Sequence, residues 1–465
     1  MALVTQQESY ANPDFQKQFD APGAVIANVI GHVIAVAPPA LYVMSAPVLM
    51  KHYLVGTAEI AQMLGIGMAM ASVAAFFVGL YTHRANQRNI ALAGVVLHMF
   101  GSLVALLTGT WGGMIAGRAM SAIGDGMALA STNAVLTRNS QNVRYWAISG
   151  VATSLAISLG TLFLGMTLES RGPSILFVML LVTGACGLPL MAWLPKYTLE
   201  TASRAAIGKV SVRALLKPLG NKPAILILGS TFLIAVGDTA IFSFVAVIGS
   251  ARGYPLEQIG IVQSVTYFTV TATGLAVAYF AMRWGRAKPV LLFSLLFAAA
   301  SMTVTGLQGF WAYAAGSLIM AVAFRGILPF VYGVAAAQDR SGGLTAILGV
   351  CVGLGSSVGP NLAVVAMGDS GNFLIAGTLG AVLCLIGGAT QASPERSLAR
   401  GARQPATTWL AVSPISPSSR SIRARSISRR SPHSIVIARA ATSSHPILAG
   451  AKSASTSSDL ITAAR

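Results

Sequence analysis

The sequence predicts an all-α membrane protein with about twelve transmembrane helices. Hydrophobic residues make up 54% of the 465 residues and charged residues only 9%, whereas charged residues are about 25% of a soluble domain. Apolar runs of about 20 residues, the length that crosses a bilayer, recur along the chain. Basic residues gather in alternate connections between these runs, which is typical of the cytosolic loops of a polytopic membrane protein.

The apolar runs place the helices in two sets of six. We expect spans near 23–49, 57–82, 89–109, 111–137, 145–168 and 173–194, and then near 223–249, 257–282, 289–308, 310–336, 343–367 and 371–391. The domains predicted from this pattern are a polar cytosolic lead-in (1–22), an N-terminal six-helix bundle (23–195), a basic cytosolic linker (196–222), a C-terminal six-helix bundle (223–391) and a tail (392–465). The tail is rich in Ser, Arg and Ala and reads as disordered; it either touches anionic lipid or has no role, and it is also compatible with an out-of-frame end.

The two halves repeat at an offset of roughly two hundred residues, as expected of a transporter built from internal repeats. Trp111 falls opposite Trp311, and Asp125 falls opposite Arg325. The net charge of +18 lies in short loops and in the tail, so it indicates membrane topology and not nucleic-acid binding. The alternation of basic loops places both termini in the cytosol.

Enzyme and cofactor signatures are missing from the sequence. The three cysteines lie in apolar runs, which predicts neither a disulfide framework nor a zinc site. Neither a phosphate-binding G-x-x-x-x-G-K-[ST] loop nor an H-E-x-x-H metal motif occurs. We therefore expect no enzyme activity, no catalytic residues, no metal and no cofactor.

The segment 111–138 is apolar enough to cross a bilayer yet contains Arg118 and Asp125. Charges inside a membrane span are costly and mark functional sites by default. The two residues are seven apart, so they share one face of a helix. Glycines crowd the same segment, which predicts close packing against neighbouring helices.

Two loops and the fourth span resemble the motifs of the major facilitator superfamily. The loop GLYTHRANQR keeps the Gly and two Arg of the G-x-L-A-D-R-x-G-R-[RK] signature but has His where the family has Asp; the residues concerned are Gly79, His83, Arg84 and Arg88. The matching loop of the second half, AYFAMRWGRA, keeps Arg283, Gly285 and Arg286. RAMSAIGDG in the fourth span is similar to R-x-x-[QS]-G-x-G-x-G.

The resemblance covers roughly residues 23–391 and implies the fold of that family, two pseudo-symmetric six-helix bundles that rock around a central site. It also implies that the two loops gate the inner side. A simpler interpretation of Arg84 and Arg88 is that they only set the topology.

In this family the first, fourth, seventh and tenth helices line the central cavity, which gives the intramembrane charges candidate roles. Asp125 and Asp238 are candidate proton carriers. The alternatives are a permanent salt bridge from Asp125 to Arg118 or Arg325, and a capped helix break beside Gly237 for Asp238.

Arg325 and Arg118 are candidate ligands for an anionic group, because guanidinium matches carboxylate and phosphate and stays charged when buried. The alternatives are charge balance for the two aspartates, and for Arg118 a side chain that snorkels. The first span adds His32 and Tyr42 as candidate substrate contacts, although a histidine that only packs in the bundle is the simpler interpretation of His32.

These observations predict a monomeric secondary transporter of the inner membrane that works by alternating access. We expect proton-coupled symport of a small organic anion. One alternative is proton-driven efflux of an amphipathic compound. A second is a membrane sensor or assembly partner that has the same fold and transports nothing.

Overall fold

The computed structural model describes residues 13–81, 86–196, 220–284, 287–338 and 343–402, and these residues form helices and their connections without a strand. The first set of helices is α3 (Pro22–Tyr53), α4 (Thr57–Tyr81), α5 (Gln87–Thr108), α6 (Trp111–Leu136), α7 (Asn142–Arg171) and α8 (Ser174–Met191). The second set is α11 (Lys222–Phe242), α13 (Leu256–Trp284), α14 (Ala287–Gly306), α15 (Phe310–Gln338), α16 (Gly343–Met367) and α17 (Phe373–Ala402). Short elements are α2 (Pro13–Asp20), α12 (Val245–Ala251) and the 3-10 turn η2 (Gly368–Ser370).

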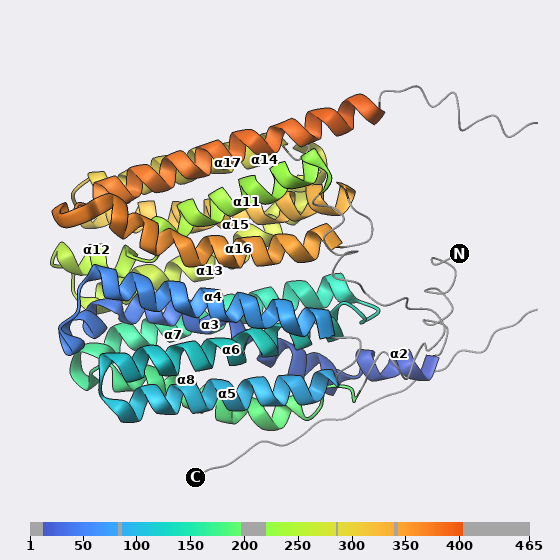
Figure 1. Ribbon diagram of the computed structural model, residues 1–465, viewed down its shortest axis with the longest axis horizontal. Coiled ribbons are helices and arrows are strands. Elements are labelled where there is room, and N and C mark those ends of the chain that lie inside the picture. Colours follow the sequence, from blue (N-terminus) through green and yellow to red (C-terminus); the bar gives the residue numbers. More distant parts are fainter. Residues whose placement is uncertain (1–12, 82–85, 197–219, 285–286, 339–342, 403–465) are drawn as a thin grey trace, which may run out of the picture. The chain divides into compact units, whose positions relative to one another are not determined.

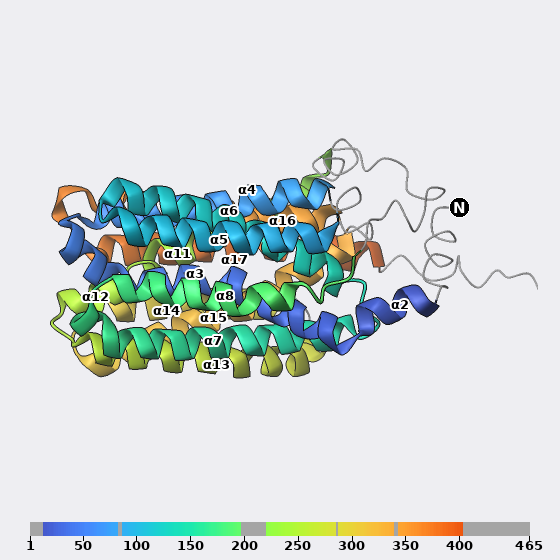
Figure 2. The ribbon, with the colours of Figure 1, turned by 90° about the horizontal axis from the view of Figure 1, so that it is seen from below.

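The predicted fold class, an all-α polytopic membrane protein, is confirmed. Ten of the described helices are long and apolar enough to cross a membrane. Helices α6 and α13 are not among the ten, although they are 26 and 29 residues long and lie among the others (Figure 1). The long helices run alongside one another, with α12 at one end and α2 at the opposite end in both views (Figures 1 and 2). We call these the α12 end and the α2 end.

Most helix bounds fall within a few residues of the prediction, and two predicted spans, 223–249 and 371–391, differ from it. The predicted span 223–249 divides into α11 and α12, because the chain turns at Ser243 and Phe244, where the Phe244 amide donates to the Ile241 carbonyl. Helix α3 stays continuous through its internal prolines. Helix α17 runs to Ala402, past the end predicted at 391, because its polar extension is rich in the strong helix formers Ala, Leu, Arg and Glu.

The predicted lead-in also contains structure. Helix α2 packs on the connection between α6 and α7: Phe19 is buried, the Asn139 side chain donates to the Phe19 carbonyl (2.7 Å), and the Ser140 amide donates to the Asp20 carboxylate (2.9 Å). The rest of the lead-in (1–12), most of the predicted linker (197–219) and the tail from 403 onward lie outside the described residues.

Helices α5 and α6 approach so closely that glycine is required at their contact. A Cβ atom on Gly124 would lie 2.3 Å from the Gly94 carbonyl oxygen, and one on Gly117 would lie 2.5 Å from the Gly101 carbonyl oxygen. Real Cβ atoms do not approach backbone this closely, so both helices must present bare backbone here. This confirms the close packing that the glycines of the fourth span predicted.

The two sets of helices meet through α4 with α16 and through α7 with α13. The Asn361 amide donates to the Ala61 carbonyl (3.5 Å), and a Cβ on Gly165 would lie 2.8 Å from the Cα of Gly260. These contacts lie toward the α12 end of the helices. Toward the α2 end, residues 68–80 of α4 include no buried residue. A Cβ on Gly353, near the middle of α16, would lie 1.8 Å from the Ser72 hydroxyl oxygen of α4. In the described part of the chain, the two sets therefore pack closely from the α12 end to about the middle of α4.

Replacing Gly124 with Val should destabilise the protein, because the added side chain must push α5 and α6 apart. Overpacking of this kind costs about 1–3 kcal/mol. The matched control is Gly112→Val in the same helix, since a Cβ there meets nothing within 4 Å. Thermal unfolding in detergent, followed by size-exclusion chromatography, measures the difference; equal unfolding temperatures for the two variants would contradict the packing described.

Candidate functional site

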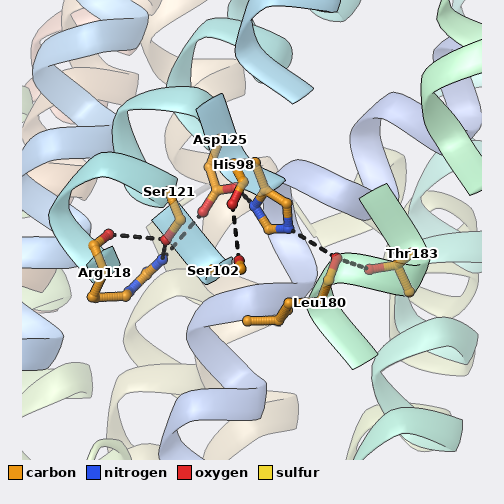
Figure 3. Close-up of polar contacts among 7 residues, drawn as sticks. All are labelled: His98, Ser102, Arg118, Ser121, Asp125, Leu180 and Thr183. Carbon is orange, nitrogen blue, oxygen red and sulfur yellow. Dashed lines mark hydrogen bonds and ion pairs between the residues drawn. The ribbon is translucent and has the colours of Figure 1, made fainter. Parts of the chain in front are cut away.

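Helix α6 carries a buried ion-pair cluster that uses both oxygens of one carboxylate (Figure 3). The Arg118 Nη1 lies 3.2 Å from Asp125 Oδ2, and the Nδ1 of His98, on α5, lies 2.6 Å from Asp125 Oδ1. The side chains of all three residues are at most 2% exposed. Arg118 and Asp125 therefore share one face of α6, as predicted, and this face is directed toward neighbouring helices.

The Arg118 guanidinium is enclosed on its remaining sides. Its Cζ lies 4.6 Å from the centre of the Tyr42 ring, which is a cation–π contact between α6 and α3. A Cβ on Gly67 of α4 would lie 2.5 Å from the guanidinium Nε, so the group rests directly on that helix. Arg118 thus contacts Tyr42 and also forms the ion pair with Asp125. Both side chains are buried, so neither is accessible to a solute.

His98 completes the cluster, and sequence reasoning missed it. Its Nε2 lies 3.3 Å from the Leu180 carbonyl oxygen of α8, so the ring bridges three helices. A signal was present in the sequence: α5 and α6 each carry two glycines seven residues apart, and these pair in the structure. Pairing Gly94 with Gly124 would have placed His98 beside Asp125.

A second group of charged and polar side chains includes residues from both sets of helices. Arg325 on α15 is exposed, whereas Asp238 on α11 is only 5% exposed. Arg325 exerts an electrostatic effect on Asp238, on His32 of α3 and on Tyr267 of α13, which places the four side chains in one region. Arg325 lies roughly 20 Å from either end of its helix at 1.5 Å per residue, close to the middle of a bilayer.

The surroundings of His32 include polar and aromatic side chains of the first set. Its ring packs edge-on against Trp146 of α7, with ring centres 5.8 Å apart, and Asn133 of α6 lies beside it. The alternative of a helix break at Asp238 is wrong, since α11 is continuous from Lys222 to Phe242. Gly237 serves packing instead, because a Cβ there would lie 2.7 Å from the Gly380 carbonyl oxygen.

The structure therefore divides the predicted site residues into two groups. Asp125, Arg118 and Tyr42 lie together inside the first set of helices, while Asp238, Arg325 and His32 lie together between the sets. Among the described residues, no hydrogen bond or ion pair links the two groups. Asp125 pairs with Arg118 and not with Arg325.

The predicted gating residues are described only in part. Gly79 lies in α4, and Arg88 lies in the first turn of α5, where its amide donates to the Asn86 side chain (3.1 Å) that caps the helix. Arg283 lies in α13, without a description of its side chain. His83, Arg84, Gly285 and Arg286 lie outside the described residues.

Comparison with known proteins identifies the family. The model of the Major Facilitator Superfamily matches residues 29–256 and 227–443, so the chain belongs to this family of transporters. Its fold is shared with solved structures, one of which is the crystal structure of a POT family transporter in complex with a thioalcohol-conjugated peptide. That match has a TM-score of 0.62 and 12% sequence identity, and it covers 79% of this chain and 96% of the other. A search of curated proteins finds no match.

Replacing Asp125 with Leu should destabilise the protein strongly, because Arg118 would be left buried without its carboxylate. Breaking a buried ion pair in this way costs about 3–5 kcal/mol. We expect Asp125→Leu combined with Arg118→Met to recover part of the loss, since no unpaired charge remains. Asp369→Asn is the control, because this carboxylate is exposed. Thermal unfolding in detergent checks the series; a double variant as unstable as the sum of its single changes would show that the pair is not coupled.

Proposed function

We propose that this protein is a monomeric secondary transporter that couples protons to the uptake of a small organic anion across the inner membrane, by alternating access. The observation that carries the proposal is the exposed Arg325, halfway along an apolar helix and within electrostatic range of the buried Asp238 carboxylate. A mid-membrane charge of this kind is a functional-site candidate by default.

Arg325 suits an anionic substrate because its charge is available. Within the described chain it forms no ion pair at salt-bridge distance, unlike Arg118, which is buried against Asp125 and Tyr42. A guanidinium offers donors that match a carboxylate or phosphate bidentately. The proposal therefore assigns anion binding to Arg325 and not to Arg118. Of the two other predicted substrate contacts, His32 belongs to the Arg325 group and Tyr42 contacts Arg118.

Asp238 supplies a route for proton coupling. While ionised, its carboxylate attracts the Arg325 guanidinium and competes with any substrate anion. Protonation removes that competition, so proton and anion bind together more favourably than either alone, which is a reciprocal coupling between two sites. Because the proton and the anion favour each other's binding, this coupling drives symport if two forms of the carrier change between the access states: the empty form and the form that holds both ligands.

The contacts between the two sets of helices support alternating access. They include backbone approaches toward the α12 end at Gly65, Gly165 and Gly260, a mid-helix contact between Ser72 and Gly353, and a hydrogen bond from Ser158 to the Ser264 carbonyl (2.9 Å). None of these contacts is an ion pair, so the two sets can separate without leaving a buried charge unpaired. The basic residues Arg138 and Arg144 lie at the α2 end, and the positive-inside rule places that end in the cytoplasm, together with both termini. The described conformation then corresponds to a carrier closed toward the outside.

Arg325→Ala should abolish anion binding while leaving the fold intact. A ligand at one hundred times its dissociation constant stabilises the native state by about 2.7 kcal/mol, so a panel of small carboxylates should include compounds that raise the unfolding temperature of the unaltered protein. The variant should lose this response, and the control Arg144→Ala, an exposed arginine in the first turn of α7, should retain it. An equal response in Arg325→Ala would reject the anion site.

Asp238→Asn should separate exchange from proton-driven accumulation. In proteoliposomes with a pH gradient, inside alkaline, the unaltered protein should accumulate a carboxylate found in the binding screen, and a protonophore should prevent this. The variant should still exchange labelled for unlabelled anion but should not accumulate it. Expulsion under the same gradient would favour efflux, and a protein that binds but never moves the anion would favour a sensor.

A further inference from the structure

Two hydroxyl groups of helix α7 differ from the hydroxyls farther along the same helix. The side chains of Ser149 and Thr153 are 0% and 5% exposed, yet neither hydroxyl oxygen has a hydrogen-bond partner among the described residues. In contrast, Ser158 donates to a carbonyl of α13, and Thr161 and Thr167 donate to carbonyls about one turn earlier in α7. A buried hydroxyl without a partner costs free energy, so these two positions are suited to a partner that is not part of the chain.

The two hydroxyls lie on the side of α7 that faces α3. Residues 146, 149 and 153 are three and four positions apart and so share one face of the helix. On this face the Trp146 ring packs against the His32 ring of α3, with ring centres 5.8 Å apart. One turn before His32 lies Asn28, which is 1% exposed; its amide nitrogen donates to a carbonyl of α6 (2.9 Å), but its Oδ1 has no partner in the described part of the chain. Three buried neutral polar atoms without partners therefore lie on the facing sides of α3 and α7, near His32.

The charges nearby favour one carboxylate on a ligand and not two. Arg325 is within electrostatic range of His32, so the Arg325 group adjoins the three neutral atoms. Arg118 is buried against Asp125 and Tyr42 and is not available. The other described Arg and Lys residues of α3, α6 and α7 lie in, or just beyond, the end turns of these helices. The ligand that fits is therefore anionic at one end and neutral but polar at the other.

We propose that the transported anion is a hydroxylated monocarboxylate of the sugar-acid class, whose carboxylate binds Arg325 and whose hydroxyl groups bind Asn28, Ser149 and Thr153. This inference rests on the function proposed above, which assigns the carboxylate to Arg325. A hydroxyl group both donates and accepts, so it matches an amide oxygen as well as another hydroxyl. A hydrocarbon chain in the same place would leave the three buried atoms unpaired, which is how a site rejects an analogue that lacks a hydroxyl.

Three six-carbon acids test the substrate class on the unaltered full-length protein: gluconate, hexanoate and adipate. Gluconate has the hydroxyls, hexanoate lacks them, and adipate replaces them with a second carboxylate. Titration calorimetry in detergent should show gluconate binding at least about tenfold more tightly than either of the others, the effect of one or more net hydrogen bonds. Arg325→Ala should abolish gluconate binding.

A variant of α7 tests the position of the hydroxyl subsite. Thr153→Val removes the hydroxyl and keeps the shape of the side chain, so it should weaken gluconate binding by about tenfold and should not weaken hexanoate binding. The matched control is Thr167→Val on the same helix, where the hydroxyl already donates to the Phe163 carbonyl (2.6 Å), and it should bind gluconate as the unaltered protein does. The comparison of the three acids needs no variant, so it decides the substrate class even if Thr153→Val does not fold.

Two outcomes would overturn the inference and leave the anion site in place. One is hexanoate or adipate binding as tightly as gluconate through Arg325, and the other is gluconate binding that is the same in Thr153→Val and in the control. If none of the three acids binds in a manner that depends on Arg325, the proposed function itself is rejected, and the inference is rejected with it.

Discussion

The structure depends on how the chain accommodates ionised side chains among helices that exclude water. An unpaired charge in hydrocarbon is costly, and removal of one partner from a buried pair leaves that cost unbalanced. Asp125 meets the requirement with both of its oxygens, one facing Arg118 and one facing His98. This is possible only because glycines let α5 and α6 approach until their backbones touch, which brings His98 within 2.6 Å of a residue on another helix.

The intramembrane charged residues form two groups that differ in exposure. The cluster around Asp125 is closed, since the side chains of Asp125, Arg118 and His98 are at most 2% exposed and both carboxylate oxygens have a partner. The group around Arg325 is open, since Arg325 is exposed and, among the described residues, forms no ion pair at salt-bridge distance, although it exerts an electrostatic effect on Asp238. A closed cluster stabilises one arrangement of helices, whereas an open charge can bind a solute. Because α4 contacts both Arg118 and α16, the closed cluster lies one helix away from the contact between the two sets.

The contact between the two sets of helices is suited to being made and broken. Its close approaches involve glycines and small side chains, such as Gly165 with Gly260 and Gly353 with Ser72, and its hydrogen bonds include a 2.9 Å bond from the Ser158 hydroxyl to the Ser264 carbonyl. Dispersion between small residues gives cohesion when the surfaces fit and leaves no buried charge unpaired when they separate. The ion pair of Arg118 and Asp125, in contrast, lies within one set and need not be broken by that movement.

The sequence by itself determined the fold class, nearly all the helix bounds and the family, because apolar length, basic-loop alternation and glycine-rich motifs are local properties of the chain. It also selected Arg118, Asp125, Asp238 and Arg325, since a charge in an apolar run stands out without any partner. Only the tertiary structure decided which of them meet: Asp125 with Arg118 and the overlooked His98, and Arg325 with Asp238. The physical reason is that pairing depends on helix rotation and on approach distance, and these follow from packing across helices that no single segment encodes.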